Sequence, residues 1–382
     1  MRINVMSWNM AGAKMLEHLD PPTDPVAKSY ISAYRHVWLK GITPYLSSPR
    51  KIHPDIILLQ ECIGFTDTSI DPSGRWGKGQ SILSEIFQGY KCYFFPAVTS
   101  HENPHPAKWL KYQQGGDVEN FIPPYINIQQ GYGICIKEGI QPRTLWIASK
   151  CWEETFNDAD KPDRDATLCF EPISITTGLY QGDRDTEPRK AILGRVLLSS
   201  GSEKRYVNFL NVHLNTLKGE REGSIRLNRT AGQSRLVQID LLLNNVVSAY
   251  QEARTYRVPV RGDNRKEDIW IIGGDFNATP DSEEISLIKR MGFVDGHEKS
   301  EQKEIEDQNS DSPYHGKVGT KWSLKSRSAP PIALDYIFCG LERVAFPAGK
   351  LNTHDSKKPF RPLFPREEFE SDHAVLFASF GI

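Results

Sequence analysis

The stretch IWIIGGDFNATPDSEE, from Ile269 to Glu284, ends an apolar run with polar residues and decides how the rest of the chain is interpreted. Residues 269–272 are all apolar, and so short a run is typical of a strand that is buried on both faces. Gly273 and Gly274 then remove side-chain bulk at the point where this strand ends. The stretch therefore predicts a central strand that leads directly into polar side chains.

Those polar side chains are Asp275 and Asn277, which normally prefer water. If the strand continues through Phe276, Asp275 and Asn277 point to one face and Phe276 to the other. Further on, Asp281 and Glu284 are predicted as the N-cap and N3 residues of a helix. Taken alone, the stretch fits a strand with a capped turn as well as it fits a functional site. The other predicted strands are needed to distinguish these two interpretations.

Composition sets broad limits on the kind of protein. The chain has 382 residues, of which 38% are hydrophobic and 25% charged, as in a globular protein with a sizeable core. Its net charge of −1 provides no overall field for capturing polyanions, so a nucleic-acid or phospholipid partner would need local basic patches. The six cysteines form no C-x-x-C pair, which predicts buried free thiols instead of a disulfide framework or a zinc site.

The beginning of the chain, MRINVMSWNM, is predicted to be a first strand and not a secretory signal. No segment approaches the ~18 continuous apolar residues of a membrane span. We therefore expect a cytoplasmic protein.

Strand patterns recur along the chain and outnumber helical ones. Nine segments are predicted as strands: INVMSW, DIILLQ, YKCYFFPA, YGICIK, ILGRVLLSS, RYVNFLNVHL, DIWIIGGDF, ALDYIFCG and AVLFASF. Helical stripes are predicted within residues 30–46 and at Leu236, Ile239, Leu243 and Val246. This balance favours two packed sheets with helices outside, a layered α/β or α+β plan. Length alone would suggest two or three domains but also allows one large domain, and we expect a single domain, 1–382.

Three segments are predicted to be surface insertions into this domain, near residues 98–128, 298–317 and 350–370. The second is mostly acidic and is expected to be a solvated loop. The first and third mix basic and aromatic residues, which suits contacts with phosphates and stacked bases, although such loops also pack onto a core.

Acids, amides and histidines occur at six predicted strands, near their ends or inside buried runs. They are Asn9, Glu61, His213, Asp275 with Asn277, Asp335, and Asp372 with His373. Each has an ordinary structural explanation when it is taken singly. Because isolated ionised groups are costly to bury, several of them are expected to share one polar cleft, paired with each other or with a metal.

The residue types in this set indicate a chemistry. Oxygen ligands from Glu61, Asp372 and Asn9, without a set of thiolates, suit Mg²⁺ or Mn²⁺ better than zinc. His373 with Asp335 behind it suits an oriented imidazole. Asp275 beside an amide is suited to orient a water molecule. The chain lacks G-x-S-x-G, P-loop and G-x-G-x-x-G motifs, and the set fits metal-assisted attack of water on a phosphate ester.

The motifs SWN, LQE, NVHLN, GDFN, LDYIF and SDH, in this order, resemble the endonuclease/exonuclease/phosphatase superfamily, which has the deoxyribonuclease I fold. The resemblance extends from Asn9 to His373. It implies a four-layered sandwich, in which two central, mostly antiparallel β-sheets are flanked by helices and the site lies at one edge.

The resemblance also implies roles for these residues. Glu61 is similar to the main metal-binding glutamate, with Asn9 and Asp372 as further metal ligands. His373 is similar to the histidine that contacts the scissile phosphate, Asp335 to the aspartate that orients it, and His213 to a second active-site histidine. Asp275 is similar to the acid that positions or deprotonates water, and Asn277 to a ligand of phosphate oxygens. Whether one or two metal ions take part, and which group is the base, stays open.

The leading hypothesis from the sequence is a divalent-metal-dependent phosphodiesterase that acts on DNA or RNA. Its candidate phosphate contacts are Arg184, Arg189, Lys190, Lys357, Lys358, Arg361 and Arg366. One alternative is a phosphatase or phospholipase-type hydrolase of a small phosphoester or phospholipid. The other is a non-catalytic binding module, which the presence of every expected catalytic residue type disfavours.

Overall fold

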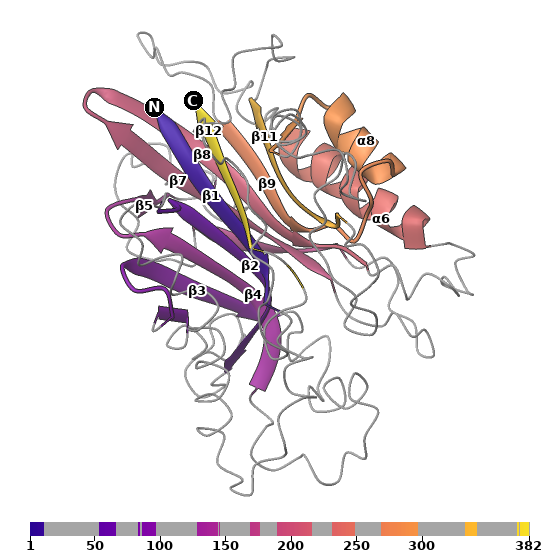
Figure 1. Ribbon diagram of the computed structural model, residues 1–382, viewed down its shortest axis with the longest axis horizontal. Helices are drawn as coiled ribbons and strands as arrows, with labels where there is room; N and C mark the ends of the chain where they lie inside the picture. The colour runs from indigo at the N-terminus through magenta and orange to yellow at the C-terminus, as the bar shows by residue number, and fades with distance from the viewer. Residues whose placement is uncertain are drawn as a thin grey trace, which may run out of the picture.

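The computed structural model describes the parts of the chain that form its two sheets and the helices beside them. The described residues are 1–10, 53–65, 83–84, 86–96, 128–143, 145, 169–175, 189–215, 231–248, 269–296, 333–341, 373 and 375–381. Figure 1 shows the two sheets as overlapping layers, with helices beside one of them and the two termini close together.

The first sheet has five strands in the order β12–β1–β2–β4–β3. Their bounds are Arg2–Asn9 for β1, Ile56–Phe65 for β2, Tyr90–Pro96 for β3, Ile128–Lys137 for β4 and Leu376–Gly381 for β12. Strands β1 and β2 run parallel, and the other neighbours in this sheet are antiparallel.

The second sheet has seven strands: β10–β11–β9–β8–β7–β5 in order, with β6 also paired to β7. Their bounds are Gln141–Pro142 for β5, Phe170–Ser174 for β6, Lys190–Ser200 for β7, Glu203–His213 for β8, Ile269–Asp275 for β9, Val294–Asp295 for β10 and Asp335–Leu341 for β11. Here β8 and β9 run parallel, and the remaining pairs are antiparallel.

Strand β9 lies between two hydrophobic cores, as its continuous apolar run predicted. Ile269 and Ile271 belong to the core that also contains Leu58 of β2, and this core fills the space between the sheets. Trp270 and Ile272 belong to a second core, which three helices cover: α6 (Ala231–Asp240), the π-helix η4 (Leu241–Ser248) and α8 (Glu283–Arg290). The prediction of a sandwich of two mostly antiparallel sheets flanked by helices is confirmed.

The directions of the strands bring their functional ends to one edge. The parallel pairing of β1 with β2 ends at this edge with Asn9 and Gln60, and that of β8 with β9 ends there with His213 and Asp275. Strands β11 and β12 are antiparallel to β9 and β1, so they begin there. Because parallel neighbours end together and antiparallel neighbours begin where the other ends, residues from five strands and His373, which precedes β12, meet at one place.

Two local expectations need correction. The N-cap of α8 is Ser282, whose Oγ accepts from the backbone N–H of Ile285 at 3.4 Å, and not Asp281. Glu284 is therefore at N2 instead of N3, and it is buried with its carboxylate 2.7 Å from Nε of Arg235 in α6. The Glu284 side chain therefore forms a tertiary ion pair with Arg235 and not the predicted capping box.

The strands that the sequence did not reveal are short ones at the margins of the second sheet: β5, β6 and β10. Strand β6 contains Pro172, which removes a ladder donor and hides a strand pattern. The predicted helix within 30–46 and the proposed insertions lie outside the described residues, apart from Ile128, which begins β4. Among the helices of the described part, none is long and apolar enough to cross a membrane.

Five of the six cysteines fall within the described residues, and all five are buried free thiols, as predicted: Cys62, Cys92, Cys135, Cys169 and Cys339. Cys151 lies outside these residues.

Candidate active site

Asn9, at the end of β1, links the two sheets at the shared edge. Its Nδ2 donates to Oε1 of Glu61 at 3.1 Å and to Oδ2 of Asp275 at 2.9 Å. Glu61 belongs to the first sheet and Asp275 to the second, so the edge of the sandwich gathers two carboxylates around one amide. Both Asn9 and Asp275 are almost fully buried, whereas 18% of the Glu61 side chain is exposed.

Glu61 reaches this position through a β-bulge. The pairing of β2 with β4 shifts register between Leu59 and Cys62, so Gln60 and Glu61 lie opposite one residue of β4. Glu61 has φ +50°, a left-handed conformation that costs a non-glycine residue about 1–2 kcal/mol. Such outliers persist where the surrounding structure enforces them and are frequent at functional sites.

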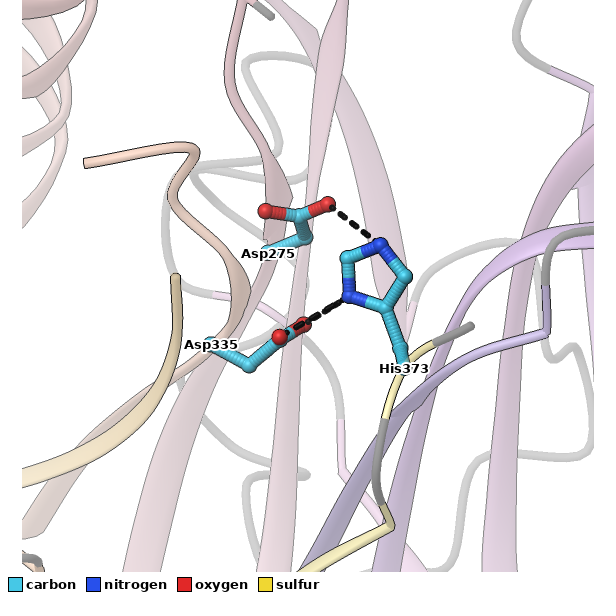
Figure 2. A group of neighbouring side chains, drawn as sticks. All are labelled: Asp275, Asp335 and His373. Atoms are coloured by element: carbon cyan, nitrogen blue, oxygen red, sulfur yellow. Dashed lines mark hydrogen bonds and ion pairs between the residues drawn. The ribbon is translucent and has the colours of Figure 1, made fainter. Parts of the chain in front are cut away.

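His373 lies between two aspartates, one at each ring nitrogen (Figure 2). Its Nδ1 is 2.9 Å from Oδ2 of Asp335, and its Nε2 is 3.8 Å from Oδ2 of Asp275. Because a carboxylate accepts, Nδ1 carries a proton and donates to Asp335. The backbone carbonyl of His373 accepts from Nε1 of Trp8 at 3.3 Å, which anchors this residue beside β1.

His213, at the end of β8, has the opposite arrangement. Its Nδ1 lies 2.9 Å from a terminal nitrogen of the Arg189 guanidinium, which has donors only. Nδ1 therefore accepts, and the proton of the neutral imidazole is on Nε2. That nitrogen is 3.6 Å from both Oε1 of Glu61 and Oδ2 of Asp275.

Asn277 closes the loop that follows β9. Its backbone N–H donates to Oδ1 of Asp275 at 2.9 Å, and its Nδ2 donates to the carbonyl of Leu214 at 3.0 Å. Asn277 has φ +48°, which asparagine tolerates better than most residues. The strand ends at Asp275, so Asn277 orients that carboxylate through a tight turn and not through a continued strand.

Gly274 is required by the packing just before Asp275. It has φ +147°, and a Cβ atom at this position would lie 1.9 Å from the carbonyl oxygen of Val212. Only glycine allows β8 and β9 to approach this closely, and their approach sets His213 opposite Asp275 in the parallel register.

The structure thus brings together seven of the eight predicted site residues: Asn9, Glu61, His213, Asp275, Asn277, Asp335 and His373. Asp372 lies outside the described residues, as do five of the predicted phosphate contacts: Arg184, Lys357, Lys358, Arg361 and Arg366. The other two, Arg189 and Lys190, are not on the surface: they are 1% and 4% exposed.

Three further residues of this region, Arg189, Gln60 and Asn211, make contacts that the sequence did not predict. Arg189 was predicted to contact phosphate but contacts His213. Gln60 and Asn211 belong to the motifs LQE and NVHLN, and the hydrogen bond between them was not predicted. The available signal was a polar residue inside a strand that is otherwise buried. That signal does not identify the partner, because the partner comes from another strand.

The donor set fits a hard divalent cation. Glu61, Asp275 and Asp335 contribute carboxylate oxygens, and within the described residues no thiolate accompanies them. Asp275, Asp335 and His373 present ligand atoms within 4.8 Å of one another, all on buried side chains. Anionic groups gathered in this way would repel a phosphate, and a cation placed among them would reverse that effect.

The chain belongs to the endonuclease/exonuclease/phosphatase family, whose model matches residues 6–373. Members of this family are in general metal-dependent hydrolases of phosphoester bonds. No curated protein matches the chain significantly.

Solved structures with a similar fold share little sequence with this chain. Truncated TDP2 from Caenorhabditis elegans aligns with a TM-score of 0.50 and 14% identity, covering 100% of this chain and 98% of the other. The human Nocturnin catalytic domain with bound sulfate gives 0.49 and 18%, covering 100% and 93%. TDP2 from D. rerio, complexed with a single-strand DNA product, gives 0.48 and 15%, covering 100% and 99%. These similarities concern the fold alone.

Proposed function

We propose that this protein is a divalent-cation-dependent phosphodiesterase that cleaves DNA or RNA. The observation that carries the proposal is the position of His373 between Asp335 and Asp275 (Figure 2). Asp275 in turn accepts from Asn9, which also donates to Glu61. An imidazole held by one carboxylate and facing a second can perform acid–base chemistry at a phosphorus centre.

Each residue has a definite part in the proposed reaction. Asp275 orients a water molecule and takes its proton as the water oxygen attacks phosphorus. The P–O ester bond opposite the attacking oxygen breaks, and the leaving oxygen receives a proton from Nε2 of His373, which starts as the imidazolium and becomes the neutral imidazole that keeps its proton on Nδ1. Asp335 holds the ring through Nδ1, and Nε2–H of His213 donates to a phosphate oxygen. The products are a phosphomonoester and an alcohol.

A cation completes the site. Glu61, with Asn9 and Asp372, would hold Mg²⁺ or Mn²⁺, which when bound neutralises negative charge on the phosphate. Asn277 keeps the Asp275 carboxylate in its orientation through the 2.9 Å backbone bond.

Nucleic acid is proposed as the substrate because of the composition of two segments. Residues 98–128 and 350–370 mix basic and aromatic residues, a combination suited to phosphate contacts and base stacking. With a net charge of only −1, the chain does not repel a polyanion strongly.

The test is a cleavage assay on end-labelled single- and double-stranded DNA and RNA, with Mg²⁺, Mn²⁺ or EDTA. Wild type is compared with Glu61→Ala and with Glu138→Ala, which removes an exposed glutamate after β4. We expect metal-dependent cutting by wild type and Glu138→Ala, and a higher Mg²⁺ requirement in Glu61→Ala.

Two results would contradict the proposal. Cutting that persists in EDTA would exclude the cation. Hydrolysis of small phosphoesters or phospholipids, without cleavage of any polymer, would assign the site to the alternative substrate class. The cleavage ladder would also distinguish endonucleolytic from exonucleolytic attack.

A further inference from the structure

The bulge that presents Glu61 is held from the opposite sheet. Asn211 lies in β8, is fully buried, and its Nδ2 donates to the carbonyl of Leu59 at 2.9 Å and to that of Gly133 at 3.1 Å. Leu59 and Gly133 are the last regular pair of β2 and β4 before the bulge. Asn211 therefore binds both strands at the point where their pairing becomes irregular.

The same side chain also engages the first bulge residue. Oδ1 of Asn211 accepts from Nε2 of Gln60 at 2.7 Å. Both N–H groups and the carbonyl oxygen of the Asn211 amide are thus used between the sheets, in a layer where a polar group without partners would be costly. Gln60 immediately precedes Glu61, so the contact fixes the backbone just before the metal-ligand candidate.

Position along β8 explains why this residue can act there. Val207, Phe209 and Asn211 face the first sheet, since the two apolar residues belong to the core between the sheets. His213 follows on the same face and lies 3.6 Å from Oε1 of Glu61. One strand therefore carries His213 and also supports the bulge that carries Glu61.

We propose that Asn211 is a positioning residue, whose amide holds the β2 bulge in the register that directs Glu61 toward the divalent cation. The inference rests on the proposed function, in which Glu61 binds that cation. Because side chains alternate along a strand, removal of the bulge by a one-residue slip would turn Glu61 to the opposite face. Asn211 reaches neither cation nor substrate and acts through Glu61.

The experiment measures Mn²⁺ binding to the whole protein by electron paramagnetic resonance, without any substrate. We compare wild type, Glu61→Gln, Asn211→Leu, Asn208→Leu and the double variant that combines Glu61→Gln with Asn211→Leu. Asn208 is the matched control because it is an equally buried asparagine of β8, on the face that carries Leu210 and Val212 toward the helices. We expect Asn211→Leu to weaken Mn²⁺ binding by ~10-fold or more, as loss of a group that orients a metal ligand does.

The control and the double variant make the test specific. Asn208→Leu is expected to bind Mn²⁺ within about twofold of wild type, because distant independent sites do not couple. Asn211→Leu should add nothing further in the Glu61→Gln background, because it acts through that ligand. Wild-type affinity in folded Asn211→Leu, or an equal loss in Asn208→Leu, would overturn the inference.

Three further outcomes are also informative. If Asn211→Leu does not fold, Asn211→Ser keeps one donor, and an affinity loss of about threefold or more supports the inference whereas wild-type affinity overturns it. If wild type and Glu61→Gln bind Mn²⁺ alike, the proposed role of Glu61 is wrong. If those two differ but Asn211→Leu matches wild type, only the inference about Asn211 is wrong.

Discussion

The Arg189 guanidinium lies 2.9 Å from Nδ1 of His213, so this histidine accepts at Nδ1 and directs its Nε2–H toward Glu61 and Asp275. His373 does the reverse, because its Nδ1 donates to Asp335. Two histidines of one site are therefore held by partners of opposite charge. The arrangement separates a hydrogen-bond donor, His213, from an acid–base group, His373.

This separation predicts that His213→Gln retains ~10-fold more activity than His213→Asn. The amide nitrogen of glutamine takes the place of Nε2, whereas that of asparagine takes the place of Nδ1, which faces the Arg189 donor. The measurement is kcat for cleavage of a phosphodiester, with circular dichroism to check folding. Equal activity in the two variants would contradict the proposed role of His213 as a hydrogen-bond donor.

Asp335 and His373 are expected to act as one unit. His373→Ala should lower kcat by ~100-fold or more, and Asp335→Ala should lower it to a similar extent, because the ring loses its orientation. The double variant should be no worse than the worse single variant, since the second change removes an interaction that is already lost. Multiplicative losses in the kinetics would show that the two residues act independently.

Gly274 is expected to tolerate no side chain. Gly274→Ala should destabilise the protein by about 3 kcal/mol or more, since its Cβ would overlap the Val212 carbonyl. Gly201→Ala is the control, because Gly201 also has a positive φ, +60°, but has open space around its Cβ position. We expect it to cost about 1–2 kcal/mol. Urea unfolding measures both values, and similar losses would show that backbone conformation alone is responsible.

Stability is expected to fall at alkaline pH. Burial raises the pKa of the Cys62 and Cys135 thiols above their ordinary 9.0, and raises the pKa of Tyr93 from 10.0 to about 12. The unfolded chain therefore loses these protons at lower pH than the folded protein does. The stability that these groups contribute is fully present below pH 9 and is lost as the pH rises above it. Urea midpoints between pH 8 and 12 measure this loss.

Tyr93→Phe provides the specific test of that pH dependence. It keeps the ring beside Phe170, with centroids 4.6 Å apart in the native protein, and removes the ionisable hydroxyl. The loss of stability between pH 10 and 12 should be smaller in this variant. An unchanged slope would mean that Tyr93 ionises equally in the folded and unfolded states.

The sequence by itself determined the main strands, the class of fold and most of the residues that lie together in the candidate site. Apolar runs of the length of residues 269–272 report burial on both faces, and polar residues directly after them report strand ends. These are local patterns, which depend on side-chain alternation and not on distant partners. The ordered motifs from Asn9 to His373 predicted the family, and the match over residues 6–373 confirms this prediction.

Only the tertiary structure decided how those residues are held. The bulge at Glu61 depends on Asn211, which donates a hydrogen bond to the carbonyl of Leu59, 152 positions away in the sequence. The tautomer of His213 depends on Arg189. The N-cap of α8 is Ser282 and not the predicted Asp281, and the side chain of Glu284 pairs with Arg235 instead of capping the helix. A hydrogen bond needs a partner within about 3 Å, and for a buried side chain that partner comes from whichever strand the fold brings beside it.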